Sequence, residues 1–135
     1  MPITAATAEY ACRIPQKSEL INQTSIYADE NSRPYIATYW REEGSTIPQY
    51  HLVYADGKQW QVQDLGFRKT PFSLSGGGTK RIPIARPQVI VGYSGKRISV
   101  TLVFRDAERQ NKISIATKKT LPAAPGRSVI SQRMP

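Results

Sequence analysis

Apolar and polar residues alternate along most of this chain with the two-residue period of β-strands. The alternation comes in short runs separated by turn residues. Strands are predicted at 20–28, 34–41, 49–55 and 59–65, and again at 86–91, 97–105 and 112–117. No segment carries apolar residues at the 3.6-residue period of a helix, so we expect little helix.

Two runs show the alternation most clearly. In 34–41 one face carries Tyr35, Ala37, Tyr39 and Arg41, and the other carries Ile36, Thr38 and Trp40. In 97–105 one face carries Ile98, Val100, Leu102 and Phe104. We expect Trp40 to pack in a core. Asp56-Gly57 predicts a two-residue hairpin turn in which both residues have positive φ.

The predicted strands form two sets joined by a long connection. The first set occupies 20–65 and the second 86–119, within one domain that spans 18–119. The connection contains Gly76-Gly77-Gly78, which disfavours regular structure. Residues 1–17 have no period and are predicted to be an irregular lead-in. Residues 120–135 contain three prolines, so we expect a disordered tail and no fourth strand in the second set.

Four strands in about 45 residues, followed by a second such set, are typical of β-propeller blades. The predicted fold class is therefore all-β, with antiparallel four-stranded meanders that form about two blades of an incomplete propeller. A small β-barrel or sandwich is the alternative. The pattern alone favours the barrel, because two blades cannot close a ring.

Composition excludes several classes of protein. No apolar run approaches the roughly 20 residues of a membrane-spanning helix, so we expect no membrane partner. Cys12 and His51 are the one cysteine and the one histidine, which excludes an internal disulfide and a multi-histidine zinc site. We expect no metal and no cofactor. The N-terminus lacks the basic and apolar regions of a signal peptide, and the localisation is left unassigned.

Charge is distributed unevenly along the chain. Residues 1–56 hold seven acidic and four basic residues, a net charge of −3, whereas residues 57–135 hold three acidic and fifteen basic residues, a net charge of +12. Such a basic half favours an anionic partner, either an acidic polysaccharide, a nucleic acid or an acidic protein. A solubilising surface, or compensation by another part of a larger protein, explains the same excess.

Five segments carry a resemblance to a known family. They are ELINQTS (19–25), RPYIATYWRE (33–42), IPQYHLVYADGKQW (47–60), TPFSLSGGGTKRIPIARPQVIV (70–91) and VFRDAERQNKISIAT (103–117). Over residues 14–117 the chain resembles the BNR repeat-containing family. The resemblance implies a seven-bladed β-propeller akin to polysaccharide lyases that cleave uronic-acid glycans, with relatives that are periplasmic or extracellular. A complete propeller needs several hundred residues, so we expect a fragment that is inactive alone, and whether the chain is an enzyme is left open.

The lyase reaction that the resemblance implies needs three kinds of chemical group, for which this sequence offers candidates by residue type. β-Elimination needs a group that neutralises the uronic carboxylate, a base that removes the C5 proton and an acid that protonates the leaving oxygen. Arginine suits the first task because its guanidinium binds a carboxylate bidentately, and histidine and tyrosine suit the other two. The catalytic candidates are His51, Tyr50 and Tyr39. The substrate-binding candidates are Arg86, Arg41, Arg105, Ser75 and Thr79.

Each candidate also has a structural explanation. His51 and Tyr50 are adjacent in one strand, so they point to opposite faces and cannot line one pocket without a bulge. Tyr50 and Tyr39 occupy positions that suit packing. Arg105, together with Asp106 and Arg109, fits a salt-bridged turn. Ser75 and Thr79 flank the triple glycine, which serves equally as a crossover between blades.

Three functions follow from these patterns. The first is a fragment of a lyase-like propeller that binds an acidic polysaccharide or oligosaccharide. The alternative is a basic all-β module that binds nucleic acid or another polyanion, with Tyr93 and Phe104 available to stack on bases. The third is a chain without a function of its own, which self-associates through exposed strand edges.

Overall fold

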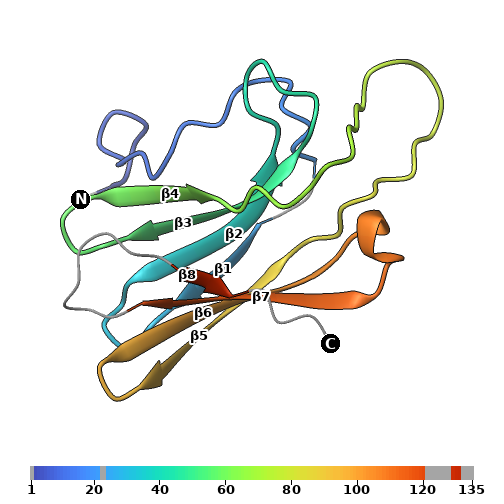
Figure 1. The fold of residues 1–135 in the computed structure, drawn as a ribbon. Helices are drawn as coiled ribbons and strands as arrows, with labels where there is room; N and C mark the ends of the chain where they lie inside the picture. The colour runs from blue at the N-terminus through green and yellow to red at the C-terminus, as the bar shows by residue number, and fades with distance from the viewer. Residues whose placement is uncertain (1, 22–23, 121–128, 132–135) are drawn as a thin grey trace.

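The computed structural model describes residues 2–21, 24–120 and 129–131. Their eight strands form two antiparallel sheets that lie face to face, each with four strands in sequential order (Figure 1). The first sheet consists of β1 (Ser25–Ala28), β2 (Pro34–Trp40), β3 (Gln49–Ala55) and β4 (Trp60–Asp64). The second consists of β5 (Gln88–Ser94), β6 (Arg97–Arg105), β7 (Ile113–Thr120) and β8 (Val129–Ser131).

The predicted all-β fold class of antiparallel meanders is confirmed, and the sheets do not close into a barrel. In the described residues the only helical segment is η1 (Ala107–Arg109), one 3-10 turn. No helix in this part of the chain is long and apolar enough to cross a membrane. All seven predicted strands are present, and the predicted strands 49–55 and 97–105 coincide with β3 and β6.

The structure differs from the prediction at the end of the second sheet. β8 pairs with β7, so a fourth strand stands where only an irregular tail was expected. It is three residues long, too short to show an alternating pattern in the sequence. The rest of the predicted tail, 121–128 and 132–135, lies outside the described residues.

The hairpin at Asp56-Gly57 is present, but its predicted two-residue turn is wrong. Ala55 pairs with Trp60, so the turn contains residues 56–59. Only Gly57 in it has a positive φ, of 95°. The Asp56 carboxylate accepts the backbone N–H groups of Lys58 and Gln59 at 2.8 and 2.9 Å. These bonds stabilise the longer turn, because an aspartate can close a turn with its own side chain.

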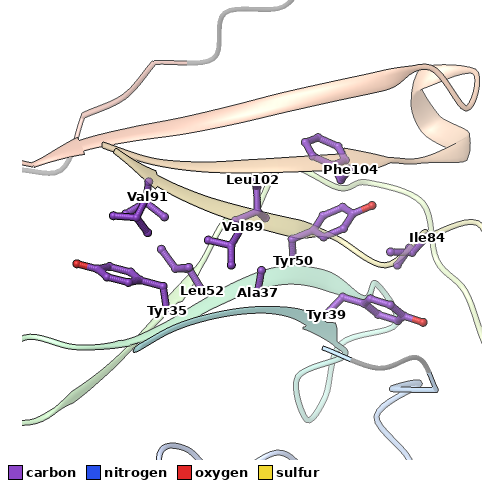
Figure 2. Close-up of a cluster of buried hydrophobic side chains, with 11 residues drawn as sticks. Tyr35, Ala37, Tyr39, Tyr50, Leu52, Ile84, Val89, Val91, Leu102 and Phe104 are labelled. Carbon is purple, nitrogen blue, oxygen red and sulfur yellow. The ribbon is translucent and has the colours of Figure 1, made fainter. Parts of the chain in front are cut away.

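The hydrophobic core lies between the two sheets, and we call the faces that form it the inner faces (Figure 2). β2 and β3 contribute Tyr35, Ala37, Tyr39, Tyr50 and Leu52, and β5 and β6 contribute Val89, Val91, Val100, Leu102 and Phe104. The predicted faces of 34–41 and 97–105 are therefore confirmed for these residues. Tyr50 meets Phe104 across the interface with ring centroids 4.8 Å apart.

Trp40 points to the opposite, outer face of the first sheet. It is 2% exposed, so the expectation that it packs is confirmed. Its ring stacks on that of His51, with centroids 3.5 Å apart.

A buried ion pair joins the segment after β4 to the end of β6. Arg68 Nε donates to Asp106 Oδ2 at 2.7 Å, and the two side chains are 0% and 1% exposed. Arg68 Nη1 donates to the carbonyls of Pro48 and Thr70 at 2.9 and 3.2 Å. The prediction that Asp106 forms a salt-bridged turn with Arg105 and Arg109 is wrong, because its carboxylate pairs with Arg68, 38 positions away.

The core predicts the effect of a truncation at Leu102. This side chain is 2% exposed, so Leu102→Ala should leave a cavity between the sheets and lower the free energy of unfolding by about 2–5 kcal/mol. Urea unfolding followed by tryptophan fluorescence measures the loss. Ile3→Ala, at a side chain that is 87% exposed, is the control and should change little. Equal effects of the two substitutions would contradict this core.

The ion pair predicts a second effect on stability. Arg68→Met leaves the Asp106 carboxylate buried without its cation, so the free energy of unfolding should fall by about 3–5 kcal/mol. The double variant Arg68→Met with Asp106→Leu should recover most of that loss, because neither charge then remains buried. The same urea measurement applies, with the exposed neighbour Lys69→Met as control. A double variant as unstable as the sum of its two single variants would show that the two side chains do not act as a pair.

Candidate functional site

A groove opens between the start of the β4–β5 connection and the turn from β6 to β7. Both segments lie at the right-hand end of the sheets in Figure 1. The groove has a volume of about 710 Å³. Its lining residues are Gly66, Phe67, Lys69, Glu108, Arg109, Gln110, Lys112, Ile113, Ser114 and Ile115.

Hydrogen bonds accepted by the Glu108 carboxylate hold the two sides of the groove together. Glu108 Oε1 accepts the backbone N–H groups of Lys69 and Thr70 at 2.7 and 2.5 Å. The Glu108 N–H in turn donates to Asp106 Oδ1 at 3.0 Å, which caps η1. The groove is therefore linked to the buried ion pair, because Asp106 both pairs with Arg68 and caps the turn that carries Glu108.

Phe67 lines one wall of the groove and is backed by two aromatic rings of the core. Phe67 packs on Tyr50 and Phe104, with ring centroids 5.5 and 5.2 Å apart. The Arg109 guanidinium carbon lies 5.3 Å from the centre of the Phe67 ring, within the range of a cation–π interaction. This contact holds a cation at the groove wall.

Positive charge dominates the groove. Lys69, Arg109 and Lys112 line it together with a single carboxylate, that of Glu108. Because Glu108 already accepts two backbone N–H groups, its charge is partly satisfied within the protein. The arrangement can attract an anion and offer it donors from lysine and arginine.

The structure places His51 away from this groove, on the outer face of the first sheet. Its Nδ1 lies 2.9 Å from the carbonyl oxygen of Gln49 and its Nε2 lies 3.0 Å from Glu42 Oε1. Burial lowers the pKa of the imidazole, and the Asp64 and Glu42 carboxylates oppose that lowering. With an exposed fraction of 0%, the ring has no surface to offer a substrate.

Tyr50 and Tyr39 lie in the core, on the inner face of the first sheet. The expected placement of His51 and Tyr50 on opposite faces is therefore confirmed. The Tyr50 hydroxyl donates to the Arg105 carbonyl at 3.3 Å. Burial, reinforced by the negative charge of Asp106, raises the pKa of Tyr50 far above its ordinary value. The phenol thus keeps its proton, and the structure does not bring the three catalytic candidates together.

The substrate-binding candidates lie at separate places, none of them in the groove lining. Arg41 is bound within the protein, because it donates to the carbonyls of Ser45 and Lys17 at 2.8 and 2.6 Å. The side chains of Arg86, Arg105, Ser75 and Thr79 are exposed. The Ser75 hydroxyl lies 2.7 Å from that of Ser73, within the glycine-rich connection.

Sequence reasoning missed the groove. Its signals were the excess of lysine and arginine after residue 56 and the turn predicted after β6. Neither signal shows that Lys69 approaches Glu108, because that contact joins segments 39 positions apart.

The described residues hold no group of three or more His, Cys, Asp or Glu side chains that could bind a metal ion. Burial, followed by the charge of Glu42, raises the pKa of the Cys12 thiol. The thiolate is therefore disfavoured.

Glu108 gives the groove a predicted pH dependence. Partial burial acts to raise the pKa of its carboxyl group, but the hydrogen bonds from Lys69 and Thr70 outweigh burial and hold the pKa below its ordinary value. The stability that the carboxylate contributes is therefore present above its unfolded-state pKa of about 4.3, and is lost as pH falls through the lower folded-state pKa.

Glu108→Gln should accordingly melt at a lower temperature than the natural chain at neutral pH, and the gap should close in acid. Thermal unfolding followed by circular dichroism at several pH values measures the gap. Glu43→Gln, in the exposed loop between β2 and β3, is the control and should change the melting temperature little. A gap for Glu108→Gln that stays constant with pH would contradict the assigned role of the carboxylate.

The first half of the chain matches a known protein family. The model of the BNR repeat-containing family matches residues 1–68, which include the first sheet and end at Arg68. The predicted resemblance extended over 14–117, so the second sheet lies beyond this match. No curated protein matches the chain. Because the family match spans half of the 135 residues, this β-propeller-type module belongs to the BNR repeat-containing family.

Proposed function

We propose that this module binds an acidic oligosaccharide, one that carries uronic acids, in the groove beside η1. The observation that carries the proposal is the cluster of Lys69, Arg109 and Lys112 around a groove whose one carboxylate is bonded to the backbone. A uronic-acid carboxylate in the groove would gain charge-assisted hydrogen bonds from these cations.

The dimensions and chemistry of the groove suit a sugar. Its volume of about 710 Å³ falls within the roughly 300–1,000 Å³ of small-molecule sites. Gln110 and Ser114 add neutral polar groups for hydroxyls, and Phe67 adds apolar surface. Lyases of uronic-acid glycans, which the sequence resemblance implies as relatives, would act on the same class of ligand.

The groove is proposed to bind the glycan and not to cleave it. β-Elimination would need a base at the C5 proton of the bound sugar. His51, Tyr50 and Tyr39 are each at most 1% exposed, so in this structure none of them can reach a glycan.

A nucleic acid is the alternative ligand, because the same cations would attract phosphates. The aromatic side chains argue against it. Phe104, one of the two rings expected to stack on bases, is 4% exposed and belongs to the core. Tyr93, the other ring, is 38% exposed. The pair therefore offers no stacking platform of the kind that single-stranded nucleic acids use.

Titration calorimetry with a short oligouronate tests the proposal on the full chain. The double variant Lys69→Gln with Lys112→Gln should bind at least tenfold more weakly, because two charge-assisted contacts of about 1.5–3 kcal/mol each are lost. The matched control is Lys58→Gln with Lys96→Gln, which removes the same charge from two exposed turns and should bind like the natural chain.

Two further ligands complete the test. A neutral oligosaccharide of equal length should bind at least tenfold more weakly than the oligouronate. Single-stranded RNA should not displace the oligouronate at equal phosphate and carboxylate concentration. Equal losses in the two double variants, or full displacement by RNA, would overturn the proposal in favour of a general attraction to polyanions.

A further inference from the structure

The outer face of the second sheet is apolar, exposed and basic. Its strand positions on β5, β6 and β7 alternate with the core residues of the inner face. Three of its isoleucines are exposed by 76%, 54% and 42%, namely Ile113, Ile90 and Ile115. The charged residues at these strand positions are Arg97, Arg105 and Lys119, all basic. Exposed apolar surface of this kind marks an interaction surface.

The outer face of the first sheet is also apolar but carries the opposite charge. Ile26 is 66% exposed and Val62 is 46% exposed. Between them in the strand register lie the half-buried Ile36 and the buried Val53, so the exposed apolar side chains stand at the two edge strands, β1 and β4. The side chains of Asp64 and Glu42, which flank His51 on this face, are 47% and 49% exposed. No lysine or arginine occupies an outward strand position of β1 to β4.

We infer that the outer face of the first sheet in one copy of this chain packs against the outer face of the second sheet in another copy. The two faces are complementary, because each exposes isoleucine or valine and their charges have opposite sign. A contact of the second sheet's outer face with itself would instead oppose basic residues to basic residues, which is unfavourable.

Such a contact is heterologous, since it joins two different surfaces. A growing chain of copies would keep one open face of each kind, one at each of its two ends, unless it closes as a ring. Self-association would thus occur through the sheet faces, whereas the sequence predicted it through exposed strand edges. It does not rest on oligosaccharide binding.

Sedimentation velocity on the full chain tests this arrangement with two blocked variants. Ile26→Lys with Val62→Lys blocks the first sheet's outer face, and Ile90→Lys with Val103→Lys blocks that of the second. Ile113 and Ile115 are left unchanged because they also line the groove. Circular dichroism establishes that each variant keeps its strands.

The natural chain should self-associate with increasing concentration, and each blocked variant alone should lose that self-association. An equimolar mixture of the two variants should form a 1:1 dimer and nothing larger, because only one pair of intact complementary faces remains. Thr46→Lys with Gln16→Lys adds the same charge at two exposed positions and should assemble like the natural chain. A monomeric natural chain would overturn the inference, as would a blocked variant that still dimerises alone or a mixture that forms no dimer.

Discussion

The buried pair of Arg68 and Asp106 is the interaction on which the rest of this structure depends. Two opposite charges with exposed fractions of 0% and 1% are tolerated inside a protein only when each is bonded to the other and to further polar groups. Arg68 Nη1 bonds to the Pro48 and Thr70 carbonyls, Asp106 bonds to the Glu108 N–H, and among these polar atoms only Arg68 Nη2 is buried without a hydrogen-bond partner. The pair therefore fixes the segment after β4 beside η1, and the groove is the space left between them.

The same pair also affects the net charge of the protein surface. Residues 57–135 contain three acidic residues, Asp64, Asp106 and Glu108. Asp106 is neutralised within the fold, and Glu108 is bonded to two backbone N–H groups. Two of these three carboxylates are therefore already engaged within the described part of the fold. This is the physical basis for the positive groove and for the basic outer face of the second sheet.

The strands were predictable because a sheet with one buried face needs apolar and polar residues to alternate along each strand. That alternation shows in the sequence which side chains share a face. The faces of 34–41 and 97–105 follow directly from it. The turn at Asp56 was predicted too short. The Asp56 carboxylate accepts two backbone N–H groups, and these bonds stabilise a longer turn in place of the two-residue turn. The groove and the ion pair were not predictable, because they arise from contacts between residues more than 35 positions apart, which no local pattern records.

The central claim is that the groove held by this ion pair receives an acidic oligosaccharide. The most direct measurement is a two-dimensional amide NMR titration of the full chain with a short oligouronate. The account predicts that saturable shifts gather at residues 66–70 and 108–115, the two sides of the groove. Shifts that gather instead on the exposed glycine-rich segment 75–79 or on β5, with the groove amides unmoved, would contradict it.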